Sequence, residues 1–150
     1  MRLAATALLV VALSSIGDAR GATTYQSRVN ALCRSYTPRM QAAKMRMEKA
    51  RAAGDLHTYA YNLGVLLGMS RAEGVKIEAT PVPAALAARM ARPLRLLHRG
   101  DSMLRIALDR AVAGDAAGFQ AEATALAKLG PSMNTALDTV GLRDCGSGQS

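Results

Sequence analysis

This chain of 150 residues contains no tryptophan, one phenylalanine and four tyrosines, and valine and isoleucine are also few. Residues that favour helices make up much of the remainder, above all alanine, leucine, methionine and arginine. Half of the residues are hydrophobic and a fifth are charged, which excludes an intrinsically disordered chain. The composition therefore predicts a single all-α domain.

Long runs of like charge are also absent, although the formal net charge is +8. No aromatic residue lies among the arginines in the way that nucleic-acid-binding segments require. Gly-x-Ser-x-Gly, a phosphate-binding loop and His-Glu-x-x-His are all missing. We therefore expect neither a nucleic-acid partner nor an enzyme.

Residues 1–21 have the pattern of a secretory signal peptide. A basic start is followed by an apolar run over residues 3–13, and the small residues Ala19 and Gly21 suit cleavage after Gly21 or nearby. A membrane-spanning helix needs about 20 apolar residues, and this run is shorter. An uncleaved membrane anchor is therefore the lesser alternative. We expect a secreted or periplasmic protein with a domain at 22–146, a disordered tail at 147–150 and no transmembrane segment after cleavage.

Four helical patterns follow, over about residues 24–53, 55–73, 83–113 and 115–141. In the first, apolar residues recur at spacings of three and four, as in helical bundles: Tyr25, Val29, Leu32, Tyr36, Met40, Ala43 and Met47. Thr37-Pro38 could begin a fresh helix, but the unbroken stripe favours a kink. Gly74 ends the second pattern, and Val75 to Pro83 is typical of an extended connector. The sequence predicts kinks near Pro38, Pro93 and Pro131.

Two of the predicted turns are nearly identical. Ala53-Gly54-Asp55 is followed by Tyr59, and Ala113-Gly114-Asp115 is followed in the same way by Phe119. In each turn, glycine ends one helix and aspartate caps the next. The match suggests two similar αα-hairpins, although Ala-Gly-Asp is also a common helix–helix turn. We predict an antiparallel up-down-up-down four-helix bundle.

The chain has two cysteines, Cys33 and Cys145. In the predicted topology the fourth helix returns to the end where the first begins, which brings these residues close together. In an exported protein such a pair most often forms a structural disulfide. The alternative, a redox-active pair, lacks the Cys-x-x-Cys spacing that lowers a thiol pKa.

Methionines could indicate a Cu(I) site, because thioethers bind soft metals. Met45 and Met47 point to nearly opposite sides of a helix, however, and cannot bind one ion together. Four methionines fall on apolar stripes, where methionine fills gaps in the core: Met40, Met47, Met90 and Met133. The single histidines, His57 and His98, lack the helical partner three or four residues away that metal sites use. We expect no metal or other cofactor, with haem held between methionine and histidine as the lesser alternative.

The third helical pattern carries a strip of arginines within about 60° of arc: Arg92, Arg95, Arg99 and Arg110. Because no acidic residue lies in this strip, it could bind anionic lipid headgroups or an acidic cell-wall polymer. The alternative is an ordinary solvated face. Arg99-Gly100-Asp101 also spells an adhesion tripeptide, which we interpret as a chance match because it falls within a helix.

Three features together suggest a resemblance: the early Cys33, the Gly114-Asp115 turn and the ending Gly141-Leu142-Arg143-Asp144-Cys145. With them the chain resembles small bacterial secreted α-helical proteins of uncharacterised activity. The resemblance implies a bundle with one disulfide and no particular activity.

The sequence therefore predicts an exported, non-enzymatic binding or structural protein of the bacterial cell envelope or exterior. We expect its partner to be an envelope protein or an anionic surface. The alternative is a small-molecule, haem or metal carrier that uses the bundle interior.

Overall fold

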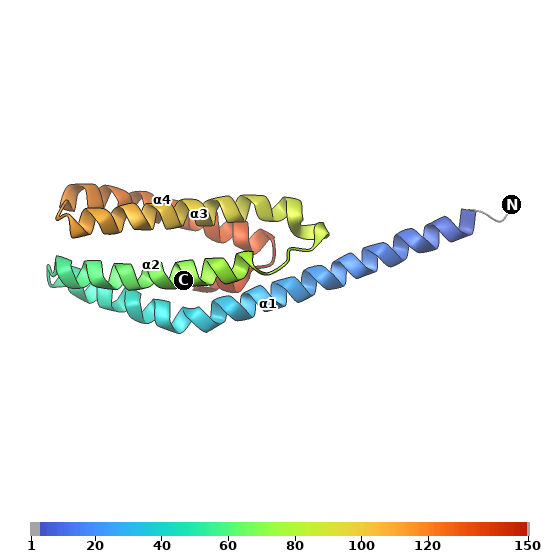
Figure 1. Cartoon of the computed structure of the whole chain (residues 1–150), viewed down its shortest axis with the longest axis horizontal. Helices are drawn as coiled ribbons and strands as arrows, with labels where there is room; N and C mark the ends of the chain where they lie inside the picture. The colour runs from blue at the N-terminus through green and yellow to red at the C-terminus, as the bar shows by residue number, and fades with distance from the viewer. Residues whose placement is uncertain (1–3, 150) are drawn as a thin grey trace.

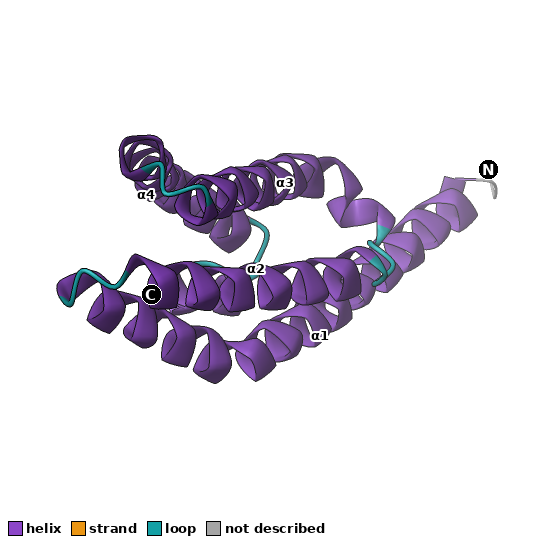
Figure 2. Ribbon diagram, turned by 60° about the vertical axis from the view of Figure 1, so that its left-hand side comes forward, coloured by secondary structure: helices purple, strands orange, loops and turns teal. Residues whose placement is uncertain are grey.

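The computed structural model describes residues 4–149, with the side chains of residues 19–148. Its four helices are α1 Ala4–Ala52, α2 Leu56–Glu78, α3 Ala84–Val112 and α4 Ala116–Thr139. Two short 3₁₀ helices follow, η1 Arg143–Cys145 and η2 Ser147–Gln149, and residues 4–149 contain no strand. Successive helices run antiparallel, with α1 beside α2 and α3 beside α4 (Figures 1 and 2). The predicted all-α bundle of helical hairpins is confirmed.

From Ala4 onward the predicted signal peptide forms the first part of α1, and the helix continues from it into the bundle without a break. Figure 1 shows this part of α1 projecting beyond the bundle. Residues 1–3 lie outside the described part of the chain. No helix of the described chain has a stretch that is both long and apolar enough to cross a membrane.

The predicted apolar stripe of α1 is the side that faces the core. Tyr25, Val29, Tyr36, Met40, Ala43 and Met47 are all buried, and Leu32 is half-buried. Pro38 lies inside α1, which continues through it rather than starting afresh. Proline lacks the N–H that would bond to the preceding turn, and Figure 1 shows α1 changing direction in its cyan part, the stretch that contains Pro38. α3 and α4 likewise continue through Pro93 and Pro131.

The two Ala-Gly-Asp turns have the same structure, as predicted. Gly54 and Gly114 adopt left-handed conformations with φ of 68° and 72°, which glycine adopts without steric cost. The N–H of Asp55 donates to the Ala50 carbonyl at 2.9 Å, and its carboxylate accepts from the Thr58 N–H. Equivalent bonds join Asp115 to the Arg110 carbonyl and the Gly118 N–H. Each aspartate therefore closes one helix and caps the next.

The predicted end of the second helix at Gly74 is wrong, because α2 continues to Glu78. Gly74 is not among the glycines with positive φ, so it does not act as a helix stop. Ile77, one turn later, is 3% exposed and packs in the core. This burial outweighs the low helix propensity of the β-branched residues that follow Gly74. The connector between α2 and α3 is therefore confined to residues 79–83, of which Ala79 still has helical dihedral angles as the C-cap of α2.

The core consists of three clusters along the bundle axis. One surrounds Cys33 near the chain's C-terminal turn and includes Tyr25, Ile77, Met90 and Leu137. A second, smaller cluster lies between α1 and α2. The third lies near the two Ala-Gly-Asp turns, where Met47, Leu63 and Ala107 pack with the aromatic side chains Tyr59 and Phe119. The core thus reaches from the disulfide end to the turn end.

The predicted tail, residues 147–150, begins with a short helical turn. Ser147–Gln149 form η2, and the Ser147 N–H donates to the Asp138 carboxylate at 3.3 Å. Residue 150 lies outside the described part of the chain.

Candidate functional site

The ends of the folded domain are joined by a disulfide between Cys33 of α1 and Cys145 of η1. Their sulfur atoms lie 1.97 Å apart and their Cα atoms 5.2 Å apart. The chain reaches α1 because Gly141 turns it at the end of α4 with φ of 79°. Leu142 then packs back onto the core with none of its surface exposed, and its N–H donates to the Leu137 carbonyl at 2.9 Å. The predicted cysteine pairing is therefore confirmed.

Polar contacts hold the same turn against α1. The side-chain amides of Gln26 and Asn30 donate to the carbonyls of Val140 and Gly141, both at 2.8 Å. The Asn30 side chain also accepts from the Asp144 N–H at 3.1 Å. Because these bonds satisfy backbone groups that the ending helix leaves unpaired, this end of the molecule is a structural joint.

The arginine strip of α3 consists of three arginines in the folded chain. Arg92, Arg95 and Arg99 are exposed, and none of them forms an ion pair or side-chain hydrogen bond with the described residues. Arg110 differs, because its guanidinium donates to the Asp115 carboxylate at 2.8 Å. We call Arg92, Arg95 and Arg99 the α3 arginine strip.

The neutralisation of Arg110 could not be seen from the positions on α3 alone. Asp115 lies beyond the end of α3 and acts as the N-cap of α4. The left-handed turn at Gly114 brings its carboxylate back to Arg110. The four arginines predicted from the sequence therefore include one, Arg110, whose guanidinium lies in an ion pair with a residue of the next helix cap.

The methionines lie apart from one another or in the core. Met40, Met47, Met69 and Met90 are buried, whereas Met45 is 68% exposed. Residues 19–148 contain no group of three His, Cys, Asp or Glu side chains placed to hold a metal ion. Methionine therefore acts in these clusters as a flexible hydrophobic side chain.

The two histidines lie near different hollows along the seam between α2 and α3. His57, in the first turn of α2, lines an apolar hollow of about 450 Å³ with Tyr61 and Val112. His98, on α3, meets the carboxylate of Glu78 at 3.3 Å. The histidines are thus not placed to act on one group.

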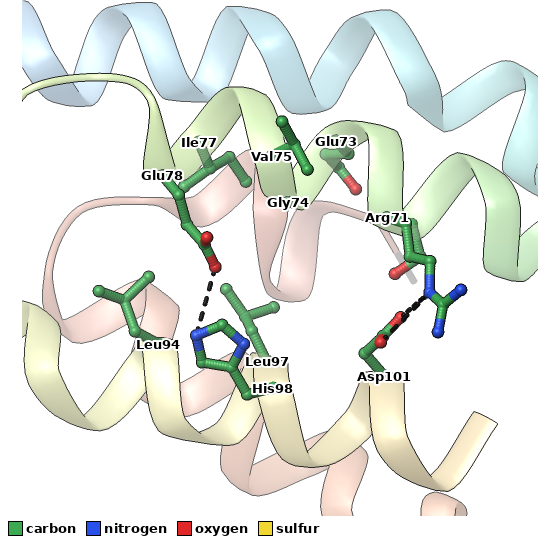
Figure 3. A pocket seen from close by; sticks show the side chains of 11 residues that line it. Arg71, Glu73, Gly74, Val75, Ile77, Glu78, Leu94, Leu97, His98 and Asp101 are labelled. Atoms are coloured by element: carbon green, nitrogen blue, oxygen red, sulfur yellow. Dashed lines mark hydrogen bonds and ion pairs between the residues drawn. The ribbon is translucent and has the colours of Figure 1, made fainter. Parts of the chain in front are cut away.

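A second hollow, which we call the α2–α3 groove, has a volume of about 290 Å³. Its ionisable lining residues are Arg71, Glu73, Glu78, His98 and Asp101 (Figure 3). Across it, His98 contacts the Glu78 carboxylate and Arg71 forms an ion pair with Asp101, both at 3.3 Å. Asp101 therefore faces α2 from within α3, and the adhesion tripeptide that it ends is not an exposed loop.

The α2–α3 groove has no signal in the sequence, because its residues come from two helices and form no local motif. The residues that α2 contributes lie partly in the segment beyond Gly74, which was predicted to be extended.

No protein family matches this chain, and neither the curated proteins nor the solved structures include a significant match to it.

Proposed function

We propose that this chain is an exported, non-enzymatic binding protein of the bacterial cell envelope or exterior, and that the α3 arginine strip binds an anionic surface. The signal-peptide pattern supports export. A disulfide that joins the first and last elements fits an oxidising compartment, because cytosolic thiols are normally kept reduced.

The observation that carries the proposal is the exposure, on one helix, of three arginines that have no ion pair within the described part of the chain. Arg92, Arg95 and Arg99 span about 10 Å along the axis, at about 1.5 Å of rise per residue. Guanidinium groups bind phosphate and carboxylate through two parallel hydrogen bonds. A row of such groups complements a surface with repeated anionic groups, and the net charge of +8 attracts the protein to it.

The proposal is tested by vesicle binding at low salt. Vesicles rich in phosphatidylglycerol should bind the wild-type protein, and zwitterionic vesicles should not. Replacing all three strip arginines by glutamine should weaken binding by about 100-fold, at about 1 kcal/mol for each basic residue near an anionic surface. Higher salt should weaken binding as well, because it screens exposed charges.

A matched control removes the same charge from another helix. Arg28, Arg39 and Arg46 of α1 are also exposed and have no ion pair within the described chain. Their triple glutamine variant should bind nearly as well as the wild type. Equal losses in the two variants would mean that net charge alone drives binding, and the α3 arginine strip would then have no special role.

The alternative carrier function is a separate proposal, and the α2–α3 groove is the observation that favours it. Native mass spectrometry of protein exported by its own host would distinguish the two, because a carrier should retain a bound ligand.

A further inference from the structure

We infer that the α2–α3 groove is a binding site for small organic cations with an apolar body, such as alkylammonium ions. The groove lies between the two hairpins and shares no residue with the α3 arginine strip. This inference is therefore independent of binding to an anionic surface.

The floor of the groove is apolar and belongs to the core. Ile77 of α2 is 3% exposed, and Leu94 and Leu97 of α3 pack against the same cluster. Gly74 lines the groove, and apart from its chain neighbours and the backbone of its own helix nothing lies within 4 Å of the position that a Cβ there would occupy. A volume of about 290 Å³ is near the lower end of small-molecule sites. The groove thus suits a compact ligand with a short hydrocarbon body.

The charge of the lining favours a cation. Glu73, Glu78 and Asp101 are three of the chain's 11 acidic residues, and all three line the same groove. Arg71 is the one permanently charged cation among the lining residues, and it already pairs with Asp101. Glu73 also has an interaction within the structure, so Glu78, which is 49% exposed, is the carboxylate that a ligand reaches from solvent. Three acidic side chains against one arginine in the lining favour positive ligands.

The contact between His98 and Glu78 can give way to a ligand. Their side chains are 66% and 49% exposed, and His98 Nε2 lies 3.3 Å from the Glu78 carboxylate. Exposed pairs of this kind contribute little to stability, so exchanging the imidazole for an ammonium group costs little. Figure 3 shows Glu78 above Leu94 and beside Ile77. An ammonium group on Glu78 would therefore place its hydrocarbon body on the apolar floor.

The test is a titration of the full mature protein with three probes of equal chain length, followed by two-dimensional NMR of the backbone amides. The probes are hexylammonium, hexanol and hexanoate. Hexylammonium should shift resonances of residues 71–78 and 94–101 in a saturable way. Hexanol and hexanoate should bind at least about tenfold more weakly, since hydrogen bonds to charged groups contribute about 1.5–3 kcal/mol.

Two single variants locate the site. Glu78→Gln should weaken hexylammonium binding by about tenfold. Glu48→Gln removes the same charge from an exposed carboxylate of α1 that pairs with Arg51 outside the groove, and it should leave the affinity within about twofold. Circular dichroism of both variants confirms the fold.

The inference is overturned if hexylammonium does not bind, if the three probes bind equally, or if Glu78→Gln binds hexylammonium as the wild type does. The glutamine variant of the α3 arginine strip should still bind hexylammonium. Loss of vesicle binding without loss of hexylammonium binding would therefore separate the two sites.

Discussion

The rings of Tyr59 and Phe119 meet edge to face, with centroids 5.1 Å apart and planes at 75°. Each aromatic follows the capping aspartate of its own Ala-Gly-Asp turn by four residues, one in α2 and the other in α4. Equivalent positions of the two hairpins therefore contact each other across the core. This relationship supports the prediction that the two hairpins are similar units.

The aromatic contact should contribute a measurable coupling energy. Tyr59→Leu, Phe119→Leu and the double variant form a double-mutant cycle, in which aromatic pairs contribute about 0.5–1.5 kcal/mol beyond their buried area. The measurement is the free energy of unfolding in urea. Strict additivity of the two single changes would show that the rings contribute only through burial.

Alanine should have opposite effects at two glycines that both have open space around them. Gly54→Ala should destabilise the protein by about 1–2 kcal/mol, because the residue has a left-handed φ of 68°. Gly68→Ala should stabilise it by about 0.5–1 kcal/mol, because Gly68 lies inside α2 without a positive φ. Urea unfolding measures both variants. Effects of the same sign would contradict this account of the turn.

Removing the disulfide should cause a large loss of stability. Cys33 and Cys145 are 112 positions apart, and the chain-entropy model gives about 4–5 kcal/mol for a loop of this length. The double variant Cys33→Ser/Cys145→Ser should unfold at a correspondingly lower guanidinium concentration. Reductant should destabilise the wild type and leave the double variant unchanged. Two titratable thiols in denatured, unreduced wild-type protein would contradict the bond itself.

The two capping aspartates should contribute to acid sensitivity. Hydrogen bonds from Thr58 lower the pKa of Asp55, and the N–H of Gly118 lowers the pKa of Asp115. These carboxyl groups therefore bind protons more weakly in the folded state than in the unfolded state. The ionised caps stabilise the folded protein above the ordinary carboxyl pKa of about 4, and this stabilisation is lost as pH falls through the lowered pKa.

The variant Asp55→Asn/Asp115→Asn retains side-chain acceptors that do not titrate in this range. Its melting temperature should therefore fall less steeply than that of the wild type below about pH 4. Asp109→Asn, at an exposed position of α3 that caps no helix, should retain the wild-type slope. Identical slopes in all three proteins would exclude the caps as the cause.

Tyr25 carries a hydroxyl that the fold does not use. Its side chain is 3% exposed, and the hydroxyl oxygen has no hydrogen-bond partner within the described part of the chain. Burial also raises the pKa of Tyr25. Tyr25→Phe should stabilise the protein by about 1 kcal/mol or more, because a buried unpaired polar group is costly. The control Tyr61→Phe, at a residue that is 70% exposed, should change stability by less than about 0.5 kcal/mol. A destabilised Tyr25→Phe would indicate that the hydroxyl has a partner.

Features that depend on residues close together in the chain could be predicted from the amino-acid pattern alone. The spacing of apolar residues identified the buried side of α1 from Tyr25 to Met47, since helical geometry relates sequence spacing directly to one face. The turns at Gly54 and Gly114 could also be predicted, because a left-handed glycine followed by a capping aspartate is a local conformational requirement. The predicted helices and turns, arranged antiparallel, were enough to predict that Cys33 and Cys145 would lie close together.

Features that depend on contacts between different helices became apparent in the folded chain. α2 continues past Gly74 because Ile77 is buried against residues that other helices supply. Arg110 is neutralised because the turn after α3 returns Asp115 to it. The α2–α3 groove exists because two helices with no shared motif pack side by side. Burial, ion pairing and cavity shape are properties of contacts between elements, and local sequence patterns do not encode them.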